Sequence, residues 1–592
     1  MPTSVAVAAS VDAVIGSYNR LRQKWRRKFE KQLLFGKMSW VLVKNMTFSF
    51  KGVLIINSKC DERFTMTKYL ISRILRSLLS VVLVVAVVML LVFSLIDRDQ
   101  AIAQAPSMSH YKNNALITYK QRLWEEAGYL DYVPYSDFLK MLLREEEITQ
   151  EEYNAAIRFA DKASQDSPET KAMVARFTEY YESRGYQVIR KDAQYQPRTE
   201  NKYKLGGEPV LFATRDIPVY NRLWTFFGNL ISIDNIHYAQ GDVGERGISF
   251  TWYDPVYGGE KFSPTIMGNG TKHKYLFYMT DEFPFIHQNL IKISLGKSMT
   301  FQEGVDVFDI MTKPQGNQVF ADTYYPSGNV ERSADDLHSL TYMQGSFNEK
   351  DPVVSRNYVD DYTYTVNKLD GMSKMGYSFV IGIISVILSY LLAIPLGIVM
   401  ARKKDTIIDT LGNLYIIFII AVPSLAYIFL FREIGSSLFN LPRNMQSQHI
   451  TWPMYVLPII SLALPSVAGL MKWLRRYMID QMSSDYVKFA RSGGLAENEI
   501  FKKHVLKNAI IPIVHGIPGS VLGAMTGAII TEAVYVVPGA GGLLTDAINQ
   551  YNNNVIIGLV LFYSLLSVTS LILGDVLMAA VDPRISFTAK ER

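Results

Sequence analysis

Six apolar segments, each long enough for a membrane helix, interrupt an otherwise mixed sequence. They run over 78–96, 375–400, 410–431, 452–471, 509–531 and 554–574, and the last continues to about 581. A helix needs about 20 apolar residues to cross the hydrocarbon core of a bilayer. The pattern therefore predicts six membrane-spanning helices, with the first one far from the other five in the sequence.

Positive charge gathers beside alternate ends of these segments. Lys and Arg are concentrated over 20–28, 402–404, 472–507 and 584–592. Because Lys and Arg favour the cytoplasmic side of a membrane, six spans would place all four groups on that side. The pattern predicts that both termini are cytoplasmic and that residues 97–374 are extracellular.

The spans divide the chain into five parts. Residues 1–65 form a basic extension that can lie on an anionic membrane surface, or that precedes the natural start, because "MTKYLISRILRSLL" from Met66 resembles one. Residues 66–96 hold the lead and the first helix, which is longer than the apolar core of a signal peptide. An outer domain over 97–374, a transmembrane domain over 375–581 and a tail over 582–592 complete the chain.

The outer domain is predicted to be α+β. Its first half has helical spacing, and Thr149 with Glu152 forms a capping box at the start of one helix. From about 207 the sequence is rich in Gly, Tyr and Asp, with runs such as "GISFTWY" and "KHKYLFYMT" that are typical of strands.

Composition and motifs favour no catalytic, metal or nucleic-acid chemistry. Net charge is +6, and Cys60 is the single cysteine, so no disulfide or Cys/His zinc site is predicted. "LGKS" at 295–298 lacks the first glycine of a phosphate-binding loop, since Ile291 stands there. The acidic pairs 335–336 and 360–361 are interpreted as solvated or capping residues. We therefore expect this chain to have no catalytic residue, metal site or cofactor of its own.

One charged loop lies between two apolar segments, over 476–508. In "DYVKFARSGGLAENEIFKKHVLKNAIIPI" the pattern predicts a short helix, a break at Gly493-Gly494, and a second helix that runs into the fifth span. A charged helical hairpin cannot be buried in lipid, so it either presents a face to a soluble partner or merely sets the topology by its charge.

This stretch resembles the coupling loop of ABC-importer permeases of the oligopeptide and dipeptide branch. The matching residues are Tyr486, Ala490, Arg491, Gly494, Leu495, Lys503, His504, Leu506, Asn508 and Pro512. It departs from the family pattern at Phe489, where a small or hydroxyl residue is common, and in the acidic tract before Lys503. Three other stretches resemble the family in order: "NLIKISLGKSM", "TEAVYVVPGAGGLLTDAI" and "VDPRIS".

The resemblance implies a type I importer permease with six transmembrane helices and a large extracellular insertion, as in enlarged Gram-positive Ami-type permeases. It implies that the loop 485–508 docks on a separate ATPase. The expected partners are a second homologous permease, two cytoplasmic ATPases that carry the ATP and Mg, an extracellular peptide-binding lipoprotein, and the lipid of a bacterial cell membrane. The implied role is oligopeptide uptake, without an enzymatic activity in this chain.

Three ionisable residues at membrane depth are candidates for the substrate conduit: His515, Glu532 and Asp575. Such residues mark transport paths unless they serve packing or an interface. Rival functions are a membrane peptide sensor or scaffold without transport, and an importer of nickel or glutathione. A membrane-anchored cell-wall hydrolase is disfavoured, because no catalytic set is legible.

Overall fold

The computed structural model describes residues 66–199, 202–281, 285–314, 316–445 and 450–581. The predicted extension 1–65 and the tail 582–592, with most of "VDPRIS", lie outside these described residues. The described residues from Ile71 onward belong to one compact unit, whose elements follow.

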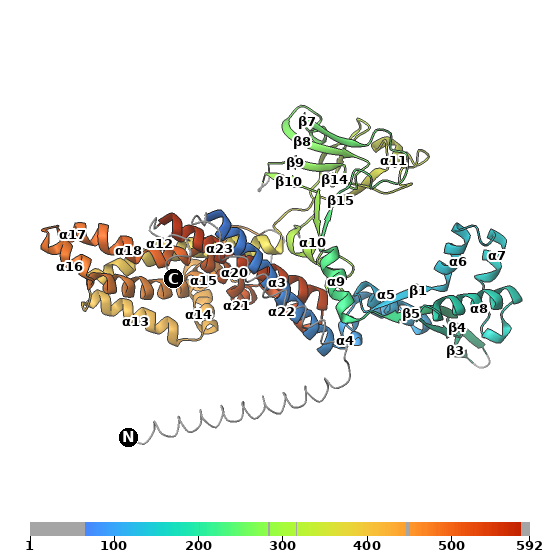
Figure 1. Cartoon of the computed structure of the whole chain (residues 1–592), viewed down its shortest axis with the longest axis horizontal. Coiled ribbons are helices and arrows are strands. Elements are labelled where there is room, and N and C mark those ends of the chain that lie inside the picture. Colours follow the sequence, from blue (N-terminus) through green and yellow to red (C-terminus); the bar gives the residue numbers. More distant parts are fainter. Residues whose placement is uncertain (1–65, 200–201, 282–284, 315, 446–449, 582–592) are drawn as a thin grey trace, which may run out of the picture. The chain divides into compact units, whose positions relative to one another are not determined.

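Five described helices are long and apolar enough to cross a membrane, and a bent pair makes six if it counts as one span. The five are α3 (Met66–Leu95), α12 (Lys374–Arg402), α15 (Pro453–Met482), α23 (Asn553–Val581) and a segmented helix over Glu497–Met525. They include the predicted first, second, fourth, fifth and sixth apolar segments (Figure 1).

The predicted third span is wrong as one continuous helix. Helix α13 (Ile407–Ala421) and helix α14 (Ser424–Phe439) are bent by 111° at the break between them. Pro423 has no N–H for a helical hydrogen bond, and it disfavours helical geometry at Val422 before it, which is extended. The bent pair is therefore either a broken span or a re-entrant loop.

The fifth span is built from short helical pieces that follow one another without a loop. Pro512 and Pro518 each stand in the first turn of a piece, where a missing N–H is tolerated. The pieces are α17 (Glu497–Ile500), the π-helical η4 (Phe501–Leu506), α18 (Lys507–Ala509), α19 (Ile511–His515), α20 (Ile517–Gly527) and α21 (Ile529–Tyr535), with α22 (Ala540–Asn549) after them.

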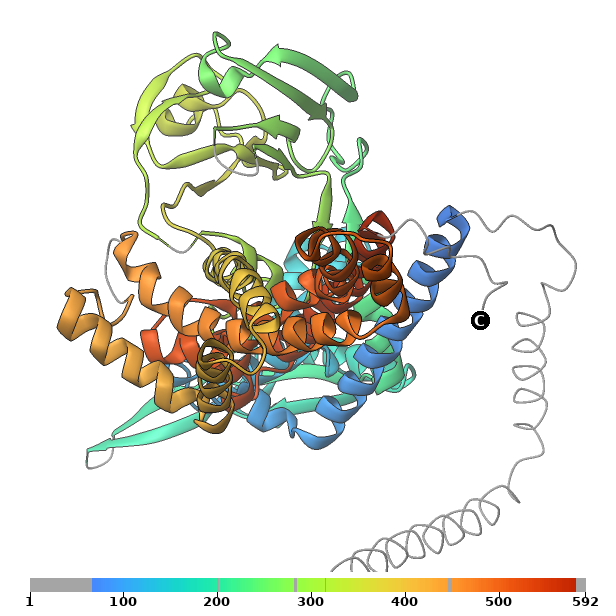
Figure 2. The same ribbon diagram turned by 90° about the vertical axis from the view of Figure 1, so that its left-hand side faces the viewer.

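Helices α12 and α15 pack closely because small side chains line their contact. The hydroxyls of Ser385 and Ser389 on α12 donate to the carbonyls of Ile459 and Ala463 on α15, each at 3.1 Å. Small and hydroxyl residues of this kind allow close approach of membrane helices. Helix α3 is less buried than α12 and α15. Among its described side chains only Val81, Val85 and Met89 are buried. It runs obliquely along the edge of the bundle that the other long apolar helices form (Figure 2).

The first half of the outer domain is mainly helical, as predicted, and the Thr149–Glu152 capping box is confirmed. It also contains an antiparallel sheet of order β1-β5-β2 that was not predicted. The elements are α4 (Arg98–Ile102), η1 (Pro106–His110), α5 (Asn113–Glu126), β1 (Leu130–Pro134), α6 (Tyr135–Arg144), α7 (Gln150–Ala156), η2 (Ala163–Gln165), α8 (Pro168–Glu182), β2 (Gln187–Lys191), β3 (Gln194–Thr199), β4 (Lys202–Gly207), β5 (Val210–Asp216) and α9 (Val219–Asn229).

The second half is built on strands, as predicted. Its main sheet has the order β10-β9-β8-β7, and "GISFTWY" is strand β7. The elements are β6 (Ile231–Ile233), β7 (Gly247–Tyr253), η3 (Pro255–Tyr257), β8 (Phe262–Asn269), β9 (Tyr275–Met279), β10 (Ile286–Gln288), β11 (Ile291–Ile293), α10 (Val307–Thr312), β12 (Ala321–Tyr324), β13 (Val330–Ser333), β14 (Asp335–Tyr342), α11 (Pro352–Asn357) and β15 (Tyr362–Asn367).

The acidic pairs of this half serve its own structure. Asp335 accepts from the Tyr325 hydroxyl at 2.6 Å, Asp360 pairs with Lys274 at 2.6 Å, and Asp361 accepts from the Phe347 amide at 2.8 Å. Within the described residues no group of three or more His, Cys, Asp or Glu side chains could hold a metal ion.

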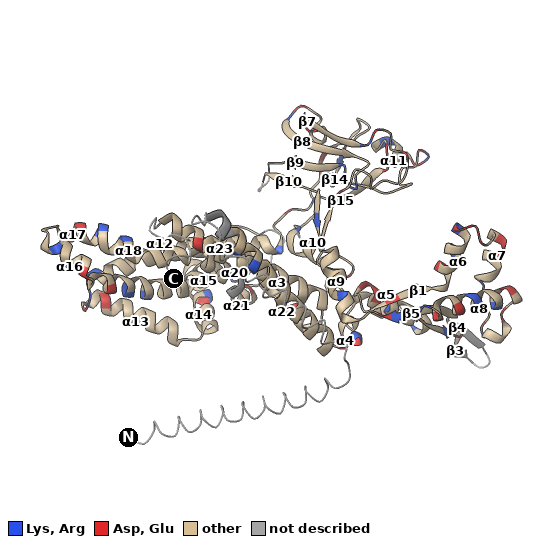
Figure 3. Cartoon of the chain, in the orientation of Figure 1, with Lys and Arg blue, Asp and Glu red and all other residues tan. Residues whose placement is uncertain are grey.

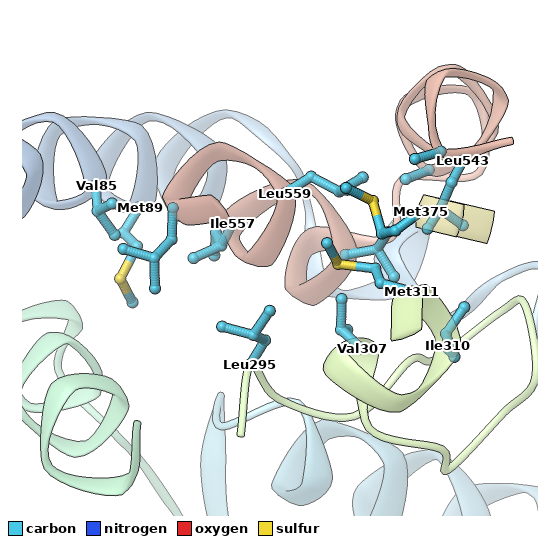
Figure 4. Packing of buried hydrophobic residues seen from close by; sticks show 14 of the residues in the cluster. Val85, Met89, Leu295, Val307, Ile310, Met311, Met375, Leu543, Ile557 and Leu559 are labelled. Atoms are coloured by element: carbon cyan, nitrogen blue, oxygen red, sulfur yellow. The ribbon is translucent and has the colours of Figure 1, made fainter. Parts of the chain in front are cut away.

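The segment around "LGKS" joins the outer domain to the bundle. Leu295 and Val307 belong to an apolar cluster with Met375 of α12 and Ile557 of α23 (Figure 4). Beside it, the Asn552 amide donates to the hydroxyls of Ser298 and Thr300, each at 2.9 Å. The lysine-containing turn is therefore a packing element at the start of α23.

Candidate functional site

The charged loop folds as two helices around one glycine. Helix α16 (Asp485–Ser492) ends in a turn where Gly494 has φ +79°. The Gly494 amide donates to the Arg491 carbonyl at 3.1 Å, and the Leu495 amide donates to the Ala490 carbonyl at 3.3 Å. This pair of bonds is a Schellman motif, which needs a left-handed residue at that position. The predicted break is confirmed, and Gly494 is the residue that creates it.

Two ion pairs shape the short helix. Arg491 reaches across the turn to Glu497, with Nε–Oε1 at 2.5 Å and Nη2–Oε2 at 3.2 Å. At the other end, the Lys488 hydrogen bond lowers the pKa of Asp485, which keeps a negative charge at the helix N-terminus. Both pairs are exposed, so solvent screens them, and they orient the turn more than they stabilise it.

Helix α16 has one buried face and one free face. Val487 and Ala490 are buried against Met478 of α15 and Ile500 of α17. On the other face the Phe489 side chain is 80% exposed. An exposed phenylalanine on a charged helix is costly in water, so this face is suited to contact with another protein. Figure 3 shows the mixed charges that surround it on α16, α17 and α18.

The second arm of the loop is tied back to the first through Tyr486. The Tyr486 hydroxyl donates to the Gln481 side chain and accepts from the Asn508 amide at 3.0 Å. Lys503 pairs with Glu499 at 2.6 Å on the exposed side of the second arm. A cavity of about 240 Å³ lies between the arms, lined by Arg402, Met482, Val487, Arg491, Glu497, Ile500, Phe501 and Val505.

The ten predicted loop residues therefore fall into two groups. Ala490, Arg491, Gly494 and Leu495 build the turn. The remaining six lie at the base of the loop: Tyr486 and Asn508, which bond each other, with Lys503, His504, Leu506 and Pro512 along the second arm.

Glu532, one of the three predicted conduit residues, is buried within the bundle. Its carboxylate accepts from the Ser378 hydroxyl at 2.6 Å and from the Gly541 amide at 2.9 Å. A Cβ atom at Gly539 or Gly541 would lie less than 3 Å from this carboxylate. Glu532 thus binds the free amides at the start of α22, in the manner of a helix cap.

Asp575 lies on α23, and its neighbour Gly574 lies against His515 of α19. Asp575 forms an ion pair with Arg73 of α3. A Cβ atom at Gly574 would lie 2.8 Å from the His515 carbonyl and 3.1 Å from its Nδ1 atom. Within the described chain the buried Nδ1 atom of His515 has no hydrogen-bond partner. The three predicted conduit residues therefore do not form one site, because Glu532 contacts α12 and α22 instead.

A buried ion pair that sequence reasoning missed joins α13 to α15. Arg475 donates from Nε and Nη2 to the two oxygens of Asp409, at 2.6 and 2.7 Å. Asp409 is buried. The sequence carried one signal for this pair, because Asp409 is an acid at the edge of the third apolar segment. Arg475 was interpreted only as part of the basic group that sets the topology.

Comparisons with known proteins identify the family. Residues 393–587 match the model of the binding-protein-dependent transport system inner membrane component. Oligopeptide transport system permease protein AmiC of Streptococcus pneumoniae serotype 4 is 33% identical over 531 residues, which are 89% of this chain and 99% of that protein. The chain belongs to this permease family.

Two further matches cover only part of this permease. Dipeptide transport system permease protein DppB of Lactococcus lactis is 29% identical over 39% of this chain and 76% of that protein. A solved amino acid ABC transporter is 16% identical over 36% of this chain and 92% of that chain, and its TM-score of 0.28 is too low to bear on the fold. The relatives named here are transport subunits rather than enzymes.

The part of the permease that the family model matches contains the charged loop and the three predicted conduit residues. Phe489, which sequence reasoning noted only as a departure from the pattern, is the most exposed apolar side chain of α16. The permease thus presents at this loop a residue that the family pattern did not single out.

Proposed function

We propose that this permease is a subunit of an ATP-driven importer that takes up oligopeptides. The observation that carries the proposal is its similarity to AmiC, which spans 99% of that oligopeptide permease and therefore includes the outer domain as well as the bundle. A match over 39% of the chain, such as that to DppB, is too short to cover both the outer domain and the bundle.

The charges favour a cytoplasmic position for both termini and the loop, with residues 97–374 outside the cell. In this orientation the loop 485–508 docks on a separate ATPase through the free face of α16. A second homologous permease completes the conduit, and two ATPase subunits carry ATP and Mg. An extracellular peptide-binding lipoprotein delivers the peptide to the outer domain.

The loop is built to transmit movement rather than absorb it. Val487 and Ala490 pack α16 onto α15, and the second arm continues without a loop as the segmented helix over 497–525. When two ATPases close on ATP, a push on α16 would move both membrane helices together. Such a rigid-body shift switches a conduit between inward-facing and outward-facing states.

A peptide needs this conduit because its backbone and charged ends cannot cross lipid unaided. Each unpaired polar group costs several kcal/mol, roughly 4–8, when it enters a hydrocarbon. His515 remains the better candidate for lining the path, since Glu532 is engaged by backbone amides and Asp575 by Arg73.

The test is co-purification of the natively expressed chain in mild detergent, comparing Phe489→Asp with Phe262→Asp. Phe262 is a similarly exposed phenylalanine on strand β8, at 64% against 80% for Phe489. We expect the unsubstituted chain to retain a second permease and ATPases. Phe489→Asp should lose the ATPases and keep the second permease, whereas Phe262→Asp should keep both.

Retention of the ATPases by Phe489→Asp would contradict docking through α16. A chain that purifies without any ATPase would instead favour the sensor or scaffold function. Uptake of labelled peptide, nickel and glutathione by the intact complex then separates the candidate substrates.

A further inference from the structure

Helix α9 (Val219–Asn229) has one face that packs against the bundle. Leu223, Phe226 and Phe227 pack against the apolar cluster that contains Val85 and Met89 of α3. The helix therefore lies beside α3, although more than 120 residues separate them in the sequence (Figure 1).

The charged residue of α9 is turned toward the same side. The Arg222 guanidinium lies 5.1 Å from the ring of Phe93 and 4.6 Å from the ring of Tyr129. It also donates to the Ile217 carbonyl at 2.8 Å and to the Tyr129 carbonyl at 3.0 Å. Arg222 is the one charged residue in the α9 sequence, so the opposite face has none.

That opposite face exposes large aromatic side chains. Tyr220 is 65% exposed and Trp224, one turn later, is 75% exposed. Their exposed neighbours Asn221, Thr225 and Gly228 are uncharged. A helix face that met only water would normally carry charged residues.

Helix α9 lies beside the end of α3 where the apolar run stops. Phe93, which Arg222 contacts, is in the last turn of α3, where the apolar run gives way to Asp97, Arg98 and Asp99. Leu91 and Leu95 in the same turns are 53% and 77% exposed, as expected of a surface that faces lipid. The exposed face of α9 thus lies where the hydrocarbon core ends.

We propose that α9 is an interfacial helix, with Tyr220 and Trp224 seated in the headgroup region of the bilayer. Tyr and Trp favour this depth because each has an apolar ring and a polar atom. Neither the last turns of α3 nor this face of α9 carries a charged residue. The contact fixes the height of the outer domain above the membrane, and it does not depend on what the permease transports.

The test uses the full chain in phosphatidylcholine nanodiscs that contain a doxyl quencher either near the headgroups or deep in the acyl chains. The fluorescence of Trp224 is obtained by subtracting the spectrum of Trp224→Phe from that of the unsubstituted chain. Trp252→Phe gives the same difference for a matched control, because Trp252 is 56% exposed on strand β7. Phenylalanine keeps an aromatic ring at these exposed positions, so both variants should fold.

We expect the shallow quencher to reduce the Trp224 signal by roughly twofold or more, the deep quencher to act less, and Trp252 to be unaffected. No quenching of Trp224, or equal quenching of Trp252, would overturn the proposal. A second readout is a nitroxide at Trp224→Cys in a Cys60→Ser background, which should be more accessible to oxygen than the same label at Trp252→Cys. Equal accessibility of the two labels, with Trp224 shielded only when a partner protein is added, would assign the face to that partner instead.

Discussion

Glu532 of this permease is held by backbone amides as well as by a side-chain hydroxyl. Glu532 binds the amide of Gly541, and a Cβ atom at position 541 would lie 2.9 Å from the Glu532 carboxylate. Burial of a carboxylate is favourable only when such donors surround it. Gly539 and Gly541 of "VVPGAGGLL" are therefore explained by close approach to Glu532, and an ionisable residue at membrane depth is explained by helix capping.

Gly494 and Gly493 offer a matched pair at the residue scale. Gly494 has φ +79° with open space around it, whereas Gly493 has φ −74°. We expect Gly494→Ala to destabilise the turn by about 1 kcal/mol. The added methyl group meets no neighbouring atom, but alanine is strained in the left-handed backbone conformation. Hydrogen exchange at the Gly494 and Leu495 amides should then be about fivefold faster, and Gly493→Ala should leave it nearly unchanged. Equal effects of the two substitutions would contradict the left-handed assignment.

Elements of the bundle differ in how firmly they are held. Helices α12 and α15 share serine–carbonyl bonds, whereas α3 buries only Val81, Val85 and Met89 among its described side chains. These three residues are spaced by four, and Arg73 lies on the same stripe. The ion pair between Arg73 and Asp575 of α23 therefore matters more to α3 than a single ion pair would to a well-packed helix.

A double-mutant cycle at Arg73 and Asp575 tests this dependence. We expect Arg73→Ala or Asp575→Ala to destabilise the chain by about 2 kcal/mol, since each breaks the partly buried ion pair that joins α3 to α23. The double variant should be less destabilised than the sum of the two, as measured by thermal unfolding in nanodiscs. The exposed pair Asp485–Lys488 provides the control cycle, where coupling should be near zero. Additive effects at Arg73 and Asp575 would show that the pair does not hold α3.

At the scale of the whole molecule, His273 in the outer domain makes the stability of the folded chain depend on pH. Burial lowers the pKa of His273, and the nearby Lys272, Lys292 and Lys313 lower it further, against an opposing effect of Asp234. Its ring is hydrogen-bonded to the Thr341 hydroxyl at 3.1 Å, between two parts of the strand-rich half.

We expect the unfolding temperature of the full chain to fall as the pH drops below about 6.5, the usual pKa of histidine. Above that pH His273 is neutral in both the folded and the unfolded chain. Below it, the unfolded chain binds a proton at His273, whereas the folded chain stays neutral until the pH reaches its own lower pKa. Proton binding therefore favours the unfolded chain in this range. His273→Gln should reduce this fall, and His237→Gln, at an exposed position, should not. A fall of the same size in all three chains would assign the effect to other groups.

The sequence alone identified the apolar segments, the charged loop with its glycine break, and the α+β character of the outer domain. These features are local, because they depend on runs of residues, on turn chemistry and on the charge beside each run. The prediction of one continuous third span was wrong at Pro423, because the apolar run forms two helices that are bent by 111°. The composition of the run does not determine the direction that the chain takes after a proline. Sequence reasoning also missed the three-stranded sheet within the helical half, whose strands come from distant positions.

Only the tertiary structure decided the roles of individual polar residues. Glu532, Asp575 and Asp409 looked alike as acids in or beside apolar runs, yet one caps α22, one pairs with α3 and one pairs with α15. Likewise Phe489 and Ala490 are adjacent, and the fold buries the alanine while it exposes the phenylalanine. Which partner a side chain meets depends on how helices from distant parts of the chain are packed, and a pattern along one chain cannot contain that information.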